Sequence, residues 1–148
     1  LVSQIVHKVN IPIIAAGGIV DAKGVRAAIE LGAIGVQIGT AYLLCPEATT
    51  SPVHRMTLKS ASAQHTALTN LFTGRLARGI VNRIMRELGP MTDTPAFPLA
   101  ASAIAPLRAK AESQSSGDFS PLWSGQNVSG CKEIPAAELT RSLAAELE

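Results

Sequence analysis

The first forty residues alternate between helix-like and strand-like patterns of apolar side chains. Residues 2–9 place apolar side chains at helical spacing, and residues 12–16 form a continuous apolar run that ends in Gly17-Gly18. A second helical pattern covers 22–31, and a second short strand covers 35–40. A continuous apolar strand is typical of a parallel sheet covered on both faces. This order of short elements predicts a βαβ unit with two parallel strands.

The helix expected over 22–31 has a start signal and a stop signal at its ends. Asp21 is an N-cap residue, and Gly32 stands where a glycine commonly ends a helix. The preceding helix is expected to end before Pro12, because proline disfavours helical geometry in the residue before it. The apolar face of the helix over 22–31 is formed by Val25, Ala28 and Ile29.

Three further helices are expected from capping residues and apolar spacing. The Ser51-Pro52 pair opens a helix that runs to about Ala63. A short helix over 82–88 ends at Gly89-Pro90, and Pro135 starts a terminal helix. The apolar face of this terminal helix is formed by Leu139, Leu143 and Leu147.

The rest of the chain lacks a clear period. Residues 66–72 fit an extended segment, whereas residues 73–79 are expected to form a basic loop bounded by glycines. The stretch 91–106, rich in proline and alanine, fits irregular chain or one short helix. The small polar residues of 109–117 indicate a loop.

Composition excludes several classes of protein. The hydrophobic fraction of 47% in 148 residues excludes a disordered, highly charged chain. No apolar run approaches the ~18 residues that a membrane span needs. A net charge of +2 with 3% aromatic residues provides no basic or stacking surface for nucleic acid. Cys45 and Cys131 are too few for a disulfide framework, so a cytoplasmic location is expected.

Both predicted strands end in glycine, at Gly17-Gly18 and at Gly39. Glycine at the carboxyl end of a parallel strand lets the backbone approach a ligand and adopt a positive φ. The amides of such loops bind phosphate, often after the last two strands of a (β/α)8 barrel. Gln37 and Thr40 add an amide and a hydroxyl, although a tight turn alone would also explain Gly17-Gly18. The dinucleotide G-x-G-x-x-G pattern and the P-loop lysine are absent from the sequence.

Five segments that together cover most of the chain carry a family resemblance. They are 11–21 (IPIIAAGGIVD), 31–41 (LGAIGVQIGTA), 43–48 (LLCPEA), 73–79 (TGRLARG) and 122–126 (LWSGQ). With these segments the chain resembles the nitronate monooxygenases, formerly called nitropropane dioxygenases. The later segments make the resemblance specific, because other flavin barrels share the two glycine strands.

This resemblance implies an α/β fold, the C-terminal part of an FMN-binding (β/α)8 TIM barrel followed by a mostly helical segment. Residues 1–48 would supply barrel strands seven and eight with their phosphate-binding loops. Residues 49–148 would form the helical or irregular segment, with a loop that returns toward the flavin and a terminal helix. The implied FMN-binding residues are Gly17, Gly18, Gln37, Ile38, Gly39, Thr40 and Gln126.

The implied activity is the FMN-dependent oxidation of alkyl nitronates, such as propionate 3-nitronate, with O2 and without a metal. The catalytic histidine of the family lies on an earlier strand-end loop, before the Ala-Ala-Gly-Gly motif. His7 is on the helix before Pro12 instead, and His54 and His65 follow the second strand. We therefore expect no catalytic residue in this chain. The sequence opens within a helical pattern and falls short of the ~250 residues of a full barrel, so a fragment that is inactive by itself is expected. Its open sheet edges favour association, including a homo-oligomer.

Two alternative functions stay open at this point. A flavin-type enoyl-acyl-carrier-protein reductase shares both glycine strands, and a truncated chain could serve only as a packing or assembly fragment. Arg75 and Arg78 fit either contacts to the flavin phosphate or the anchoring of a surface loop. Trp123 fits either a loop that covers the site or an ordinary packing anchor.

Overall fold

The computed structural model describes residues 1–147, which pack into two compact units. Residues 1–49 and 127–147 form the first unit, and residues 50–126 form the second. The terminal segment thus packs with the first segment, whereas the division expected from the sequence, 1–48 and 49–148, follows chain order. Each unit has its own two-stranded sheet and its own core.

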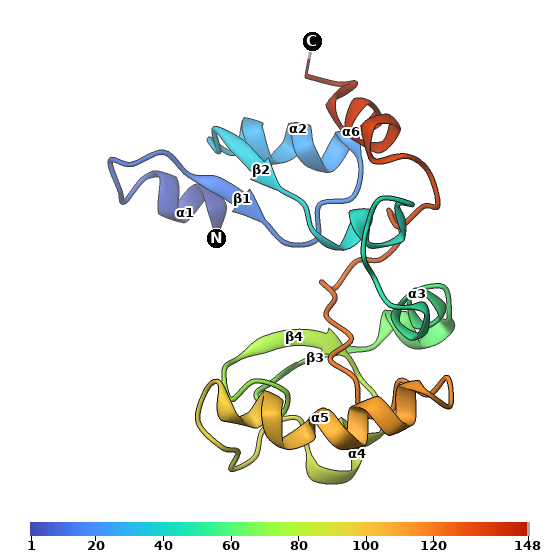
Figure 1. Ribbon diagram of the computed structural model, residues 1–148. Helices are drawn as coiled ribbons and strands as arrows, with labels where there is room; N and C mark the ends of the chain where they lie inside the picture. Colours follow the sequence, from blue (N-terminus) through green and yellow to red (C-terminus); the bar gives the residue numbers. More distant parts are fainter. Residues whose placement is uncertain (148) are drawn as a thin grey trace. The chain divides into compact units, whose positions relative to one another are not determined.

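The first unit is built on two parallel strands (Figure 1). Its first elements are α1 (Val2–Val6), β1 (Ile14–Ala16), α2 (Ala22–Glu30), β2 (Gly35–Gln37) and the 3-10 helix η1 (Thr40–Leu44). Strands β1 and β2 pair in parallel with Ala15 opposite Val36, so the predicted βαβ order is confirmed. Strand β2 is shorter than expected, because the chain leaves the ladder after Gln37 and turns into η1 at Thr40.

The ends of α2 are fixed by the two residues that the sequence indicates. The Asp21 carboxylate accepts a hydrogen bond from the N–H of Gly24 at 2.8 Å. Gly32 has a φ of +96°, and a Cβ there would lie 2.8 Å from a methyl group of Val6. Glycine is therefore required both for the backbone turn and for the close approach of α1.

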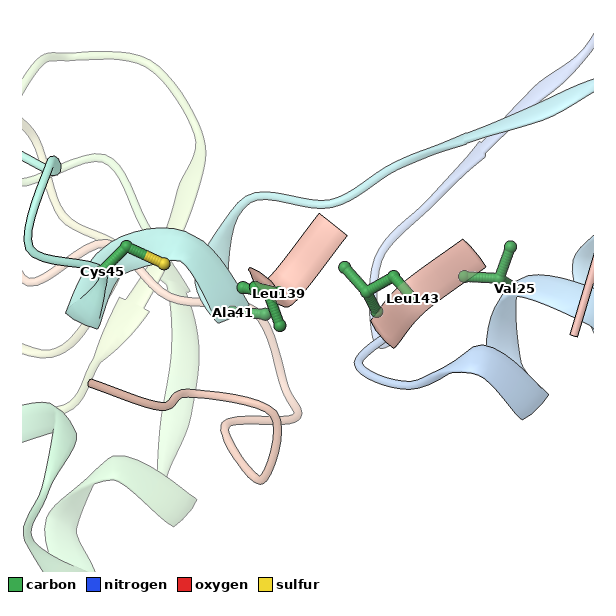
Figure 2. Close-up of a cluster of buried hydrophobic side chains, with 5 residues drawn as sticks. All are labelled: Val25, Ala41, Cys45, Leu139 and Leu143. Carbon is green, nitrogen blue, oxygen red and sulfur yellow. The ribbon is translucent and has the colours of Figure 1, made fainter. Parts of the chain in front are cut away.

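Two clusters of buried side chains join the elements of this unit. The larger cluster contains Val25, Ala41, Cys45, Leu139 and Leu143, the last two from α6 (Ala136–Ala144) (Figure 2). The smaller cluster contains Ala15, Ala28 and Ala33, with Val2 of α1 packed against it. Helices α1 and α2 therefore cover the same face of the sheet, the face to which Ala15 points.

Two of the expected core positions in this unit are wrong. Ile29 is 36% exposed and Leu147 is 52% exposed. Ile29 lies near the end of α2 and belongs to neither core cluster of this unit. Leu147 follows the end of α6 at Ala144, so helical spacing no longer holds it against the core.

The second unit is an antiparallel hairpin covered by helices (Figure 1). Its elements are α3 (Pro52–Leu58), η2 (Ala61–Gln64), β3 (Thr66–Thr69), β4 (Ala77–Ile80), α4 (Arg83–Leu88) and α5 (Leu99–Glu112). One buried cluster of this unit contains Leu71, Phe72 and Met85, against which Ile104 of α5 and Trp123 pack. None of the helices within residues 1–147 has the length and hydropathy of a membrane span.

Three expectations for the second unit need correction. Residues 77–79 belong to β4 rather than to a loop, because they pair with β3. This pairing depends on the partner strand, so residues 77–79 themselves carry no strand pattern. Helix α5 includes part of 91–106 and the start of 109–117. Its alanines favour helix, and Ile104 packs it against the core. Helix α3 ends at Leu58 and is followed by η2, instead of continuing to 63.

Candidate functional site

Two glycine-containing loops follow the parallel strands of the first unit. The first glycine loop (residues 17–20) follows β1, and the second glycine loop (residues 38–40) follows β2. Because β1 and β2 run in the same direction, both loops leave the same edge of the sheet. Such an edge is where open parallel sheets and barrels bind their ligands.

The glycines of these loops leave open space next to the backbone. Gly17 and Gly18 have φ values of +99° and +75°, a backbone conformation that residues other than glycine rarely adopt. A Cβ added at Gly17, Gly18 or Gly39 would meet no atom within 4 Å. Gly39 differs from the other two in its φ of −109°, so the expected positive φ is wrong there. At Gly39 the missing side chain, rather than an unusual backbone conformation, leaves room for a bound group.

The polar candidates of β2 and η1 lie in different surroundings. Gln37 is exposed and pairs with Ala16, on the sheet face opposite to that of Ala15. The side chain of Ile38 is partly buried and packs against the larger core cluster. Thr40 is half-buried at the start of η1, and its carbonyl oxygen accepts a hydrogen bond from the thiol of Cys131 at 3.1 Å.

A third segment, which directly follows the motif 122–126, contacts both loops. This return segment (residues 127–131) places the Nδ2 of Asn127 3.4 Å from the carbonyl oxygen of Gly18. The Oδ1 of Asn127 accepts hydrogen bonds from the N–H and the hydroxyl of Ser129, at 3.0 and 2.8 Å. The Asn-x-Ser spacing is the local signal that could have identified the turn itself, although not its contact with the loops.

Gln126, the remaining FMN-binding candidate, is the last residue of the second unit and is exposed. The other polar candidates of that unit have local partners. The Arg75 guanidinium lies 4.0 Å from the ring centre of Phe97. The Nη1 of Arg78 donates to the carbonyl oxygen of Thr66 at 3.3 Å and to its hydroxyl at 3.2 Å.

Trp123 and His54 are packed together in the second unit. The Trp123 ring meets Phe72 edge-on, with ring centres 5.6 Å apart. His54 makes a hydrogen bond to the backbone of Trp123, and burial lowers the pKa of His54 below its usual value despite this bond. The Nε2 of His54 is buried and has no hydrogen-bond partner within residues 1–147. Trp123 thus packs against the core of the second unit, the contact expected of a packing anchor.

The other two histidines lie at the surface. His7 is exposed, with its Nδ1 2.6 Å from the carbonyl oxygen of Ser3, and His65 is also exposed. Over the described part of the chain, no group of three or more His, Cys, Asp or Glu residues could hold a metal ion.

Comparisons with known proteins relate the chain to one family. The family model for nitronate monooxygenase matches residues 1–146. The nitronate monooxygenase of Pseudomonas aeruginosa is 41% identical over 99% of this chain and 42% of its own length. A probable nitronate monooxygenase of Bacillus subtilis is also 41% identical, over 99% of this chain and 43% of its own length. The chain therefore spans less than half the length of these relatives.

Solved structures agree with the sequence comparisons. A nitroalkane oxidase from Streptomyces ansochromogenes superposes on 99% of this chain and 42% of its own, with a TM-score of 0.89 and 37% identity. FabK from Thermotoga maritima superposes with a TM-score of 0.71 at 28% identity, over 99% of this chain and 47% of its own. The α/β fold thus corresponds to part of these larger structures. Because the family model covers nearly the whole sequence, the chain belongs to the nitronate monooxygenase family.

Proposed function

We propose that this chain contributes the FMN phosphate site of a nitronate monooxygenase, with β1 and β2 as barrel strands seven and eight. The observation that carries the proposal is the open space beside Gly17, Gly18 and Gly39 at one edge of the sheet. A phosphate group fits such a site, because backbone N–H groups can reach its oxygens where no Cβ intervenes. Family membership supports the choice of FMN and of an alkyl nitronate, such as propionate 3-nitronate, as substrate.

Each residue of the proposed site contributes a different contact to FMN. The backbone at Gly17 and Gly18 contacts the phosphate, and the Thr40 hydroxyl donates a further hydrogen bond to it. The exposed Gln37 amide provides a polar contact on the sheet face that carries Ala16. Gln126 is assigned to the flavin from the family motif alone. The chemistry that FMN would supply at this site is electron transfer between the nitronate and O2.

No histidine of this chain is assigned to the chemical step. His54 is packed beside Trp123, and His7 and His65 lie at the surface. In this proposal the chain binds and orients the cofactor, and we expect no nitronate turnover from the chain alone.

The test is a titration of the purified 148-residue chain with FMN, followed by quenching of flavin fluorescence. The wild-type chain is expected to give saturable quenching. Gly39→Val should abolish it by filling the space that the phosphate occupies. Gly35→Val is the matched control, because Gly35 starts the same strand at its other end, and a Cβ added there also meets no atom within 4 Å.

Two results would contradict the proposal. One is an absence of saturable quenching by the wild-type chain. The other is an equal loss of quenching in Gly39→Val and Gly35→Val, since a phosphate at the loops distinguishes the two ends of β2.

The enoyl reductase alternative is distinguished from the nitronate monooxygenase by the reaction that is catalysed, because both enzymes use a flavin. A preparation that contains this chain and supports turnover should take up O2 with an alkyl nitronate. Consumption of a reduced nicotinamide with an enoyl thioester, in place of O2 uptake, would favour the reductase.

A further inference from the structure

The two glycine loops are not joined to each other by the sheet. The ladder between β1 and β2 ends with Ala16 opposite Gln37, before either loop begins. A phosphate that contacts both loops needs their backbones at a fixed spacing, with tolerances of about 0.5 Å. The structure must therefore hold the loops by contacts outside the ladder.

The return segment supplies a contact to the first glycine loop. Asn127 Nδ2 lies 3.4 Å from the Gly18 carbonyl oxygen, while Asn127 Oδ1 is held by Ser129. A Cβ added at Gly130 would come within 2.6 Å of Val20, so the return segment lies directly against this loop. Because the Ser129 bonds fix the Asn127 amide, its Nδ2 is oriented toward Gly18.

The same segment supplies a contact to the second glycine loop. The Cys131 thiol donates to the Thr40 carbonyl oxygen across a distance of 3.1 Å. Burial, and to a smaller extent the nearby Cys45, raises the pKa of Cys131 to about 11. The thiol therefore keeps its proton at neutral pH and remains a hydrogen-bond donor.

We propose that Asn127 and Cys131 are positioning residues that hold the two glycine loops at the spacing required for phosphate binding. This inference rests on the proposed function, and it adds residues that lie 109 and 91 positions from their partners in the sequence. Neither side chain needs to touch the phosphate, because each acts on a loop carbonyl and so orients the backbone of that loop.

The experiment compares FMN with riboflavin, which carries the same ring system without the phosphate. Dissociation constants for both are measured on the whole chain, in the presence of a thiol reductant, and their ratio gives the selectivity for phosphate. Asn127→Ala and Cys131→Ala are each expected to lower this selectivity about threefold to tenfold, the range for loss of one neutral hydrogen bond. Cys131→Ser should restore it, because the hydroxyl is again a donor.

Ser142→Ala is the matched control, since the Ser142 hydroxyl bonds to the Leu139 carbonyl oxygen within α6 and not to either glycine loop. It should leave the selectivity unchanged. Thermal unfolding of every variant sets a temperature at which all are folded. A general loss of structure would weaken the binding of FMN and of riboflavin alike, and so would leave the ratio of their dissociation constants unchanged.

The outcomes separate this inference from the proposed function. A wild-type chain that binds FMN no better than riboflavin overturns the phosphate site, and the positioning role with it. A selective wild-type chain whose selectivity survives in Asn127→Ala and Cys131→Ala overturns the positioning role alone. Loss of selectivity in both variants, with recovery in Cys131→Ser, supports it.

Discussion

At the level of single residues, His54 has an arrangement that makes it sensitive to pH. It is half-buried on α3, one ring nitrogen bonds to the backbone of Trp123, and Nε2 is enclosed without a partner in the described residues. Protonation would place a second N–H in this enclosed position. Burial therefore lowers the pKa of His54 in the folded chain below the 6.5 of an ordinary histidine.

The lowered pKa predicts how stability changes with pH. Near and below pH 6.5 the unfolded chain binds a proton at His54 more readily than the folded chain does. The free energy of unfolding is therefore expected to fall as the pH decreases through 6.5, and to be insensitive to His54 above that value. Fluorescence of Trp123, the single tryptophan, during urea unfolding at several pH values measures this change.

Two variants check the assignment to His54. His54→Gln should flatten the pH dependence between about pH 7 and the acid range. His65→Gln, at an exposed position, should keep the wild-type profile. A profile that is the same in His54→Gln and in the wild type would show that another group is responsible.

Sequence reasoning predicted single residues well where the cause is local. Gly17 and Gly18 adopt the positive φ expected for glycine at a strand end, and Asp21 caps α2. It missed Asn127, whose contact with Gly18 depends on a long return of the chain. It also gave no warning that Ile38 would pack into the core.

At the level of elements, Asn82 links a helix cap to a distant loop. Its Oδ1 accepts from the N–H of Met85 at the start of α4, at 3.5 Å. Its Nδ2 donates to the carbonyl oxygens of Gly117 and Ser120, both at 2.9 Å. The side chain is only 6% exposed. Its removal takes this donor from the carbonyl oxygen of the buried Ser120, whereas the Gly117 carbonyl oxygen keeps the N–H of Ser120 as a donor.

Replacement of Asn82 should separate these two roles. Asn82→Ala is expected to destabilise the chain by about 3 kcal/mol, from the lost cap and from the loss of the donor to the buried Ser120 carbonyl. Asn82→Ser should recover about 1 kcal/mol of this, because serine caps helices well but cannot reach both carbonyls. Urea unfolding measures the difference, and equal midpoints for the two variants would contradict a capping role.

Helix α5 contains a proline in its interior. Pro106 lacks the N–H that would bond the Ser102 carbonyl, and it lies at an exposed position. Pro106→Ala is therefore expected to stabilise the chain by about 1–2 kcal/mol, less than the full helix penalty because proline also restricts the unfolded chain. A urea midpoint that does not rise would show that the helix is already bent to accommodate Pro106.

Some helices and strands could be predicted from the sequence, and others could not. The N-caps of α2 and α3 and the glycine that follows α4 were predicted, since each depends on residues within one helical turn. Strand β4 and the extent of α5 were not predicted. Their stability comes from pairing with β3 and from packing of Ile104 on the hairpin core.

At the scale of the whole molecule, apolar surface remains uncovered in the first unit. Ile11, Ile14 and Ile34 are 68%, 61% and 69% exposed. A mainly apolar pocket of about 400 Å³ lies beside β2, with Val36, Ile38 and Leu143 among its lining residues. Within residues 1–147, β1 and β2 pair only with each other, and such a two-stranded sheet is marginally stable alone.

We expect the purified chain to associate through this surface. Sedimentation velocity should reveal species larger than a monomer at micromolar concentrations. Ile14→Thr should reduce them, because Ile14 lies on the sheet face that α2 leaves open. Leu31→Thr, at a similarly exposed position at the end of α2, is the control. A monodisperse monomer that unfolds cooperatively on heating would contradict this expectation.

The sequence by itself determined the order of the βαβ elements, the N-caps of α2 and α3, and the glycines at the two strand ends. These features follow from backbone sterics and from hydrogen bonds between residues close along the chain. Only the tertiary structure decided that β4 is a strand, that α5 continues through Pro106, and that residues 127–131 return to the glycine loops. These depend on contacts between residues far apart in sequence, whose free energy is gained only when the chain packs.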